Sequence, residues 1–368
     1  MFFSVILTLL ISACQKEWRP GIPLPKEKVK IGVVYITNPF SESAGYSYAH
    51  QTGIEEMKHS LALQDSQILY KIDIDDSDSL NVENAIRELI AQEANIIFAT
   101  SWGYMDVCEK LALEHPSIVF AHATGYKYND TNFTNYFGRV YQARYLSGIV
   151  AGAQTKSGKI GFVAAWGKEN SEVTGGIDAF ALGVEKVNPE ARVYVKITNS
   201  WFDPMGETAA ARSLIASGCD IIAQHCDSAI PQIEAEKARV WGIGYNSDMS
   251  INAPDAVLTS VLWRWGVYYT AIVQSIINGT FTTNPYFGSL SEGIVDLTPL
   301  NSAISLDSGF INILAEERWL RIESGAFDVF SGIIETNDGR FIGDGGGNLT
   351  DDEIRNGINW YYRTVIEN

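Results

Sequence analysis

The chain has 368 residues, of which 46% are hydrophobic and 19% are charged, and its formal net charge at pH 7 is −17. These proportions are typical of a globular protein and exclude a disordered chain, and the length suffices for two domains with full cores. The acidic balance argues against nucleic acid as a partner, because negative charges repel a phosphate backbone.

The N-terminal segment predicts export. An uncharged apolar run is followed by the small residues Ser12 and Ala13, which stand directly before Cys14. This order is typical of a cleavable signal peptide, and a cysteine at the cut is typical of the lipobox of bacterial lipoproteins. The run is too short to cross a membrane as a helix. We expect residues 1–14 to be a signal peptide and lipobox, with Cys14 lipidated and holding the protein on the periplasmic or extracellular face of a cell membrane.

The next segment and the remaining cysteines carry no further chemistry. Residues 15–28 contain three prolines and several charged residues, which is typical of a flexible tether. Cys108, Cys219 and Cys226 are odd in number, so at least one thiol stays free. We expect buried free thiols rather than a disulfide between Cys219 and Cys226. Their spacing matches no metal site, and we predict neither a metal nor a cofactor.

From residue 29 onward, short β-branched runs alternate with helical patterns. This order of elements predicts a parallel sheet with helices on both faces. In this first part we expect strands at 29–35, 68–74, 95–99 and 118–121, and helices at 49–63, 79–92 and ending at 111–115.

The same alternation begins again at residue 158. Here we expect strands at 158–163, 192–197, 220–224, 240–244 and 257–261, and helices at 175–187, 207–217, 231–237 and 267–277. Two similar α/β lobes in series predict a binding protein with a ligand cleft between its lobes. We assign residues 29–150 and 256–290 to the N-terminal lobe, with the strand at 257–261 returning to it, and residues 151–255 and 291–335 to the C-terminal lobe.

The last stretch, residues 336–368, is less regular, and we expect it to pack on the lobes as a hairpin and a helix. Residues 336–339 read Thr-Asn-Asp-Gly between two apolar pairs, which predicts a hairpin turn. The glycine-rich residues 343–347 predict a flexible loop and not a phosphate cradle, because no Lys-Ser/Thr pair follows them. Residues 351–366 predict a capped amphipathic helix.

Aromatic and polar residues recur directly after the predicted strands, where ligands of open α/β sheets bind. Aromatic faces stack on a flat ring, and Asp and Asn offer hydrogen-bond partners to the edges of such a ring. The pattern therefore predicts a flat heteroaromatic ligand with polar edges. The clusters begin at residues 46, 100, 122, 166, 199, 224, 244 and 263.

Several of these clusters resemble the basic membrane protein (BMP) family of lipoproteins. The resemblance runs from about residue 30 to about residue 280, and its motifs lie at residues 45–50, 100–105, 122–126, 201–204, 224–228 and 244–249. It implies a type I periplasmic-binding-protein fold, with two Rossmann-like lobes and a ligand cleft between them. It also implies that the chain is the substrate-binding component of an ABC importer, with a small-molecule ligand and a membrane permease as partners.

The resemblance also implies which branch of the family is nearest. Tyr46 stands where the nucleoside-binding branch has a stacking Phe, and Trp201 stands where that branch has its second stacking aromatic residue. Asn246 replaces the first Asp of its Gly-x-Asp-x-Asp motif. Trp263 replaces a lysine that helps to hold the ribose. The pattern is instead similar to a branch that binds free purine bases, adenine in particular.

The leading hypothesis is therefore capture of a purine nucleobase between the two lobes. The predicted ligand-binding residues are Tyr46, Trp102, Trp201, Asp227, Asn246, Asp248 and Trp263. Tyr46 and Trp201 would stack on the base, and the three polar residues would contact its edge. Trp102 and Trp263 would close the sides and exclude a ribose.

Three alternatives stay open. The first is a nucleoside-binding or sugar-binding protein of the same transporter class. The second is an exported hydrolase that uses Cys226 with His225, but adjacent residues on a strand point to opposite sides and no Gly-x-Ser-x-Gly elbow is present. The third is a structural or adhesive lipoprotein. We expect a monomer without enzymatic activity.

Overall fold

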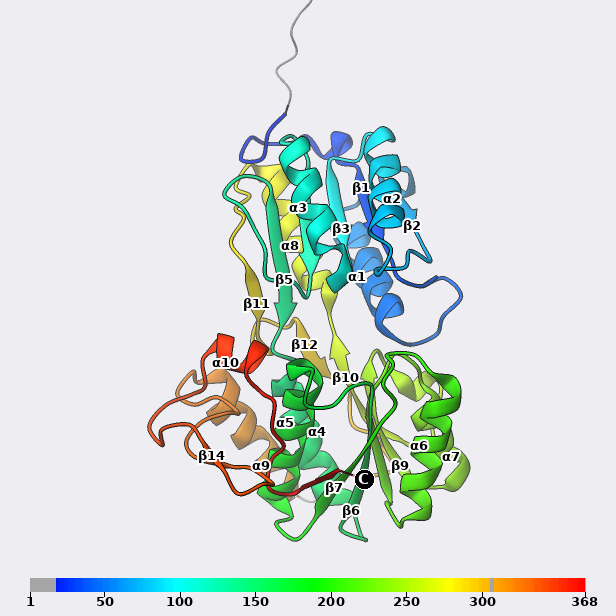
Figure 1. Cartoon of the computed structure of the whole chain (residues 1–368), viewed down its shortest axis with the longest axis vertical. Helices are drawn as coiled ribbons and strands as arrows, with labels where there is room; N and C mark the ends of the chain where they lie inside the picture. The colour runs from blue at the N-terminus through cyan, green and yellow to red at the C-terminus, as the bar shows by residue number, and fades with distance from the viewer. Residues whose placement is uncertain (1–17, 305–307, 368) are drawn as a thin grey trace, which may run out of the picture.

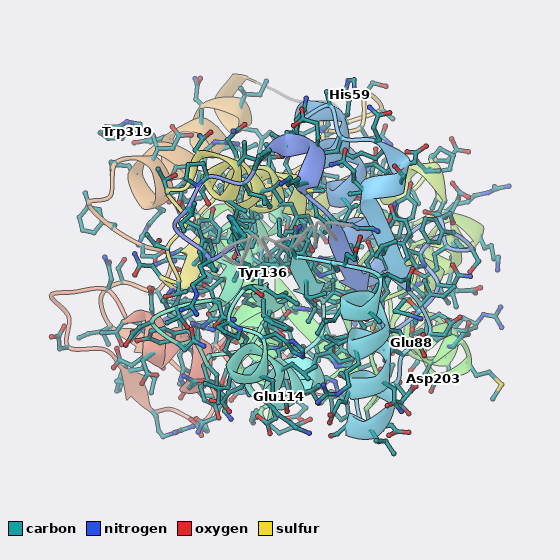
Figure 2. The ribbon with its side chains drawn as sticks, turned by 90° about the horizontal axis from the view of Figure 1, so that it is seen from above. His59, Glu88, Glu114, Tyr136, Asp203 and Trp319 are labelled. Carbon is teal, nitrogen blue, oxygen red and sulfur yellow. The ribbon has the colours of Figure 1, made fainter. Side chains whose placement is uncertain are left out.

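The computed structural model describes residues 18–304 and 308–367 and shows two α/β lobes, one above the other (Figure 1). Seen from above, Tyr136 lies in the interior, whereas Glu88, Glu114 and Asp203 lie toward the surface (Figure 2). The predicted signal peptide, Cys14 and the first residues of the predicted tether lie outside the described residues.

The first lobe is built on a six-stranded sheet in which every strand pair is parallel, with the order β11-β5-β4-β3-β1-β2. Its strands are β1 (Ile31–Val34), β2 (Ile68–Lys71), β3 (Ile96–Ala99), β4 (Val119–Ala123), β5 (Phe133–Gly138) and β11 (Tyr286–Gly288). Its helices are α1 (Tyr46–Ser60), α2 (Ser79–Ala91), α3 (Met105–Glu114) and α8 (Trp265–Asn278). All residues of β1 and β3 are buried, because helices cover both faces of a parallel sheet.

The second lobe is built on a seven-stranded sheet with the order β12-β10-β9-β8-β6-β7-β15, in which only β10 and β12 pair antiparallel. Its strands are β6 (Lys159–Ala164), β7 (Arg192–Ile197), β8 (Ile221–His225), β9 (Trp241–Asn246), β10 (Val257–Trp263), β12 (Val295–Leu297) and β15 (Val365–Glu367). Its helices are α4 (Val140–Gln154), α5 (Ser171–Val187), α6 (Pro204–Ala216), α7 (Ile230–Ala238) and α9 (Ser308–Arg318).

The second lobe holds a closely packed pair of helices, α4 and α5. Residues 140–152 of α4 are all buried. A Cβ atom at Gly148 would overlap the carbonyl oxygen of Phe180, so only glycine permits this approach of the two backbones. Tight packing of this kind resists deformation, and α4 and α5 therefore form a stiff base under the residues between the lobes.

The chain crosses between the lobes after β5, after β10 and between β11 and β12. These crossings correct two predicted boundaries. Residues 140–150 belong to α4 and pack in the second lobe, and the strand at 257–261 does not return to the first lobe. Instead β10 pairs with β9 and β12, and the chain re-enters the first lobe only with α8, which packs on α1. An apolar β-branched run shows that a strand is buried but not which sheet it joins, and this caused the error.

The C-terminal segment, which we define as residues 334–367, packs on the second lobe. The predicted hairpin is confirmed, because β13 (Ile334–Glu335) and β14 (Phe341–Ile342) pair antiparallel. The predicted helix at 351–366 is wrong beyond residue 356. Thr350 caps α10 (Asp351–Asn356) as the sequence suggests, but Gly357 follows and the β-branched end of the chain joins β7 as strand β15.

Two further findings concern the described residues alone. Cys108, Cys219 and Cys226 are buried free thiols, as predicted. Within residues 18–304 and 308–367, no helix combines the length and apolar character needed to cross a membrane.

Candidate ligand-binding site

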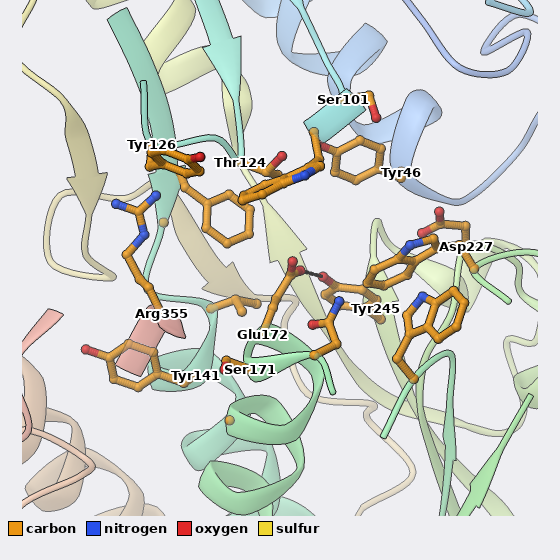
Figure 3. Close-up of a pocket in the computed structure, with 18 of the residues that line it drawn as sticks. Tyr46, Ser101, Thr124, Tyr126, Tyr141, Ser171, Glu172, Asp227, Tyr245 and Arg355 are labelled. Carbon is orange, nitrogen blue, oxygen red and sulfur yellow. Dashed lines mark hydrogen bonds between the residues drawn. The ribbon is translucent and has the colours of Figure 1, made fainter. Parts of the chain in front are cut away.

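A cavity of about 960 Å³ lies between the lobes, lined by residues that follow strands of both sheets (Figure 3). Ser101 and Thr124 follow β3 and β4 of the first lobe, and Trp166 and Asp227 follow β6 and β8 of the second. This volume is near the upper end of the roughly 300–1,000 Å³ found for small-molecule sites. The strand ends thus meet where the sequence predicts a ligand.

Tyr46 forms the aromatic wall of the first lobe. It is the first residue of α1, and its ring meets the imidazole of His50 edge-on at a centroid distance of 4.5 Å. His50 is itself stacked on Trp265 at 4.3 Å, so a buried aromatic stack fixes the Tyr46 ring. The Tyr46 hydroxyl is buried and has no hydrogen-bond partner among the described residues.

Trp201 and Trp166 line the cavity from the second lobe. Their ring centroids are 6.5 Å apart with the planes at 70°, an edge-to-face pair. The Trp201 carbonyl accepts a hydrogen bond from the Asp227 backbone N–H at 2.7 Å. Trp201 is therefore fixed beside Asp227 and lies in the lobe opposite to Tyr46.

Asp227 places a carboxyl group in the cavity. Its Oδ1 accepts a hydrogen bond from Nδ2 of the fully buried Asn246 at 3.0 Å. Burial raises the pKa of Asp227 to about 8, and nearby Glu172 acts in the same direction. The carboxyl is therefore largely protonated at neutral pH and offers one donor and one acceptor.

The lobes touch beside Asp227. A Cβ atom at Gly45, which precedes α1, would overlap the Asp227 carbonyl oxygen, and Gly45 has a φ of +105°. Nearby, Asn252 Nδ2 donates to Ser43 Oγ at 2.9 Å across the lobe boundary. Glycine at position 45 thus lets Tyr46 and Asp227 approach from opposite lobes.

A buried polar cluster around Glu172 lies on the second-lobe side of the cavity. Glu172 is in the first turn of α5 and lines the cavity, and burial raises the pKa of its carboxyl to about 7. Its Oε1 is 3.4 Å from both Tyr245 Oη and His225 Nε2. The guanidinium of Arg144 is fully buried 4.1 Å from the centroid of the Tyr245 ring, and burial lowers its pKa to about 10.

The sequence did not single out Glu172, Tyr245 or Arg144 as site residues. The start of α5 follows β6, and a search that included the first helical turn after each strand could have found Glu172. Nothing in the sequence marks Arg144 as a site residue, because it lies inside helix α4 and the prediction considered only residues that directly follow strands.

Four of the seven predicted residues line the cavity, namely Tyr46, Trp102, Trp201 and Asp227. Trp102 is 53% exposed and tilts against Tyr126, which also lines the cavity, at a centroid distance of 5.7 Å. It therefore adds an aromatic surface on the first-lobe side that is open to solvent.

Asn246, Asp248 and Trp263 do not line the cavity. Asn246 contacts Asp227 as described, and Asp248 accepts a hydrogen bond from the backbone N–H of Ser250 at 3.0 Å in a short helical cap. Trp263 is buried, stacks on Trp265 at 4.4 Å and donates from Nε1 to Tyr245 Oη. The sequence places all three near strand ends but does not show which way each side chain points.

Cys226 and His225 do not form a nucleophile–base pair. The His225 ring is directed to Glu172, whereas Cys226 Sγ lies 3.7 Å from the carbonyl oxygen of Val163. Burial also raises the pKa of the Cys226 thiol, which disfavours the reactive thiolate.

A model of the Bmp family, described as ABC transporter substrate-binding protein PnrA-like, matches residues 28–313. The chain is 35% identical to a purine-binding protein of Brucella abortus, over 94% of this chain and 95% of the relative. It is 33% identical to a putative ABC transporter glucose-binding protein of Haloferax volcanii, over 85% of this chain and 76% of the relative.

Two solved structures share the fold. A transcriptional activator of the comK gene from Bacillus halodurans has a TM-score of 0.69 and 17% identity, covering 81% of this chain and 99% of that one. An ABC transporter solute-binding protein from Conexibacter woesei has a TM-score of 0.64 and 19% identity, covering 79% and 95%. At this identity the likeness shows the fold alone, and the predicted type I periplasmic-binding-protein fold is confirmed.

Proposed function

The chain belongs to the Bmp family of PnrA-like ABC transporter substrate-binding proteins, and from this premise we propose that its cleft captures a purine nucleobase, adenine first among them. Membership in the family implies an exported protein that presents its ligand to a membrane permease. The observation that carries the purine proposal is the approach of Tyr46, Trp201 and Asp227 from two lobes around one cavity. The name of the Brucella relative supports the same ligand class.

The site residues have distinct roles in this proposal. The base lies between Tyr46 and Trp201, and each stacking contact contributes roughly 1–3 kcal/mol. The protonated carboxyl of Asp227 donates to a ring nitrogen of adenine and accepts from the neighbouring amino group. Asn246 positions that carboxyl through its hydrogen bond to Oδ1. Because the contacts come from both lobes, the bound base stabilises the closed arrangement that a permease would recognise.

A nucleoside is the second candidate, because two observations favour it. Trp263 lies in the core and so does not itself exclude a ribose from the cavity. The cavity of about 960 Å³ also has more room than a bare bicyclic ring fills. A sugar is a further candidate in view of the name of the Haloferax relative.

A ligand panel separates these candidates. Protein that starts after Cys14 is unfolded and refolded to remove carried-over ligand, and its unfolding is followed with adenine, guanine, adenosine, ribose and glucose. A base present at about 100 times its dissociation constant is expected to stabilise the protein by about 2.7 kcal/mol. A greater shift with adenosine than with adenine would contradict the nucleobase proposal in favour of the nucleoside. A shift with glucose alone would establish sugar binding.

We also propose that Cys14 is lipidated and anchors the protein, since it follows an apolar run and small residues at the N-terminus. Cys14→Ser is expected to move most of the protein from the detergent phase to the aqueous phase on phase separation of whole cells. The matched control is Cys108→Ser, which changes a buried thiol in the first lobe and should leave the partition unchanged. Equal partition of both variants would exclude an anchor at Cys14.

A further inference from the structure

The short helix α10 (Asp351–Asn356) lines the ligand cavity although it lies near the end of the chain. Figure 3 shows Arg355 at the far end of the cavity from Asp227, with Tyr126 of the first lobe above it and Tyr141 of the second below it. The ligand cavity is therefore bounded at one end by the C-terminal segment.

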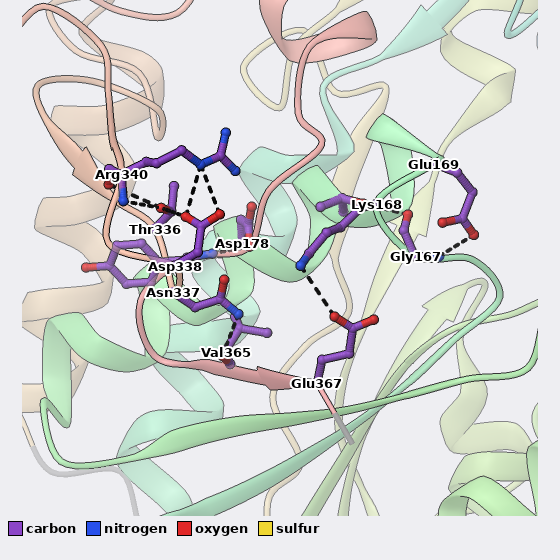
Figure 4. A network of polar contacts seen from close by, with 12 residues as sticks. Gly167, Lys168, Glu169, Asp178, Thr336, Asn337, Asp338, Arg340, Val365 and Glu367 are labelled. Atoms are coloured by element: carbon purple, nitrogen blue, oxygen red, sulfur yellow. Dashed lines mark hydrogen bonds and ion pairs between the residues drawn. The ribbon is translucent and has the colours of Figure 1, made fainter.

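The C-terminal segment is bound firmly to the second lobe. The buried carboxyl of Asp178 in α5 accepts a hydrogen bond from the backbone N–H of Tyr362 at 2.7 Å, and Arg363 forms an ion pair with Glu185 of the same helix at 3.1 Å. Within the segment, Asn337 Nδ2 donates to the carbonyl oxygen of Val365 at 3.3 Å (Figure 4). Strand β15 adds to β7, and Ile354 of α10 is buried. Since backbone, side-chain and apolar contacts all tie this segment to one lobe, α10 should move with that lobe as a unit.

Arg355 connects α10 to the opposite lobe. Its Nη2 donates to the carbonyl oxygen of Gly125 at 2.9 Å, and its guanidinium lies 5.2 Å from the ring centroid of Phe287 in β11. Asp351 adds an ion pair at 2.7 Å to Arg139, at the crossing between β5 and α4. The lobes are thus joined at this end of the cavity, as Gly45 and Asp227 bring them into contact at the other.

The Gly125 carbonyl belongs to a loop that itself contributes to the site. Thr124 and Tyr126, the neighbours of Gly125, both line the cavity. Thr124 has a φ of +66°, a left-handed conformation that is costly for a β-branched residue and persists only where surrounding contacts hold it. A charged donor on the next carbonyl is such a contact.

We propose that Arg355 is a positioning and specificity-determining residue: by binding Gly125 it holds α10 as the end wall of the cleft and sets the length of ligand that fits. The identity of the ligand rests on the proposed function. The hydrogen bond from Arg355 to Gly125, which we call the clasp, joins two residues of the chain itself and can therefore be tested apart from the ligand.

Hydrogen exchange of the ligand-free protein tests the clasp. In Arg355→Ala, the amides of Gly125 and Asn129, which donate to the carbonyl oxygens of Ala123 and Phe133, are expected to exchange about tenfold faster, which corresponds to the loss of one hydrogen bond from a charged donor. Arg355→Lys keeps a donor and should exchange nearly as slowly as the unaltered protein. The matched control is Arg340→Ala, because Arg340 is in the same segment, pairs with Asp338 and is not among the residues that line the cavity. Unchanged exchange of the Gly125 and Asn129 amides in Arg355→Ala would refute the clasp.

Calorimetric affinities for adenine and adenosine test the role in specificity. Removal of the Arg355 side chain opens the end wall, so the ratio of the two affinities should shift toward adenosine by about tenfold. Equal changes for both ligands would show that α10 does not limit ligand length. If the unaltered protein binds neither ligand, the purine proposal fails, while the exchange experiment still decides the clasp.

Discussion

Replacing both Tyr46 and Trp201 by alanine is expected to weaken adenine binding by about 2–6 kcal/mol, or roughly 30-fold to 20,000-fold. The reason is that each ring contributes one face of the proposed stack, and the two come from opposite lobes. Isothermal titration of the two single variants and the double variant measures each contribution. When a base is held on both faces, the loss of one aromatic side chain should also loosen the contact with the other. The losses of binding free energy in the two single variants should therefore not simply add up to the loss in the double variant.

Trp319→Ala is the matched control for loss of an exposed indole. Trp319 is 57% exposed and lies at the edge of the molecule, away from the cavity (Figure 2). Its substitution should leave adenine affinity unchanged. An effect of the double variant no greater than that of Trp319→Ala would rule out stacking between Tyr46 and Trp201 as the source of affinity.

The strand-end rule explains why part of this site was predictable from sequence. In an open α/β sheet the carboxyl ends of parallel strands meet at one edge, so Trp201 and Asp227, which follow β7 and β8, had to lie near the cleft. Tyr46 was predictable for a related reason, since it begins the helix that follows β1. For these three residues, the position along the backbone was enough to predict a place near the cleft.

Side-chain direction was not predictable in the same way. Trp263 ends β10 and points into a stack with Trp265, and Asp248 caps a short helix instead of facing the cavity. Residues at the ends of strands take their direction from the following backbone, which strand periodicity does not describe. The wall formed by α10 was unpredictable for a different reason: it depends on contacts between residues far apart in the chain, such as Asp178 with Tyr362.

Asp227→Asn is expected to remove part of the pH dependence of folding stability. The Asp227 carboxyl has an ordinary pKa of 3.8 when exposed, and burial raises this pKa to about 8 in the folded protein. Between these pH values the folded protein keeps a proton that the unfolded chain has released. The contribution of Asp227 to stability is therefore full below pH 3.8 and is lost as the pH rises toward 8, with a slope on the order of 1.4 kcal/mol per pH unit.

Denaturant unfolding at pH 5 and pH 8 measures this effect in the ligand-free protein. The free energy of unfolding should fall less between the two pH values in Asp227→Asn than in the unaltered protein. Glu172, whose pKa is raised to about 7, adds a fall of the same sign that remains in the variant. Asp130→Asn, at an exposed carboxyl in the loop before β5, is the control and should keep the full dependence. Identical pH profiles for the three proteins would contradict a raised pKa at Asp227.

Adenine affinity should depend on the same proton of the Asp227 carboxyl. A protonated carboxyl presents one donor and one acceptor to adenine, and so does the amide of asparagine, whereas an ionised carboxylate presents acceptors only. Adenine affinity of the unaltered protein should therefore fall about tenfold for each pH unit above the pKa of Asp227, while Asp227→Asn should bind adenine with little change between pH 6 and pH 9. Asp227→Ala, which removes both groups and leaves the Asn246 amide only its longer bond to the Cys226 carbonyl oxygen at 3.5 Å, should lose about 5-fold to 150-fold at every pH. Strong, pH-independent binding by the unaltered protein together with loss of binding in Asp227→Asn would mean that the ionised carboxylate is the binding form, and the ligand would then have to offer two donors on that edge, as guanine does and adenine does not.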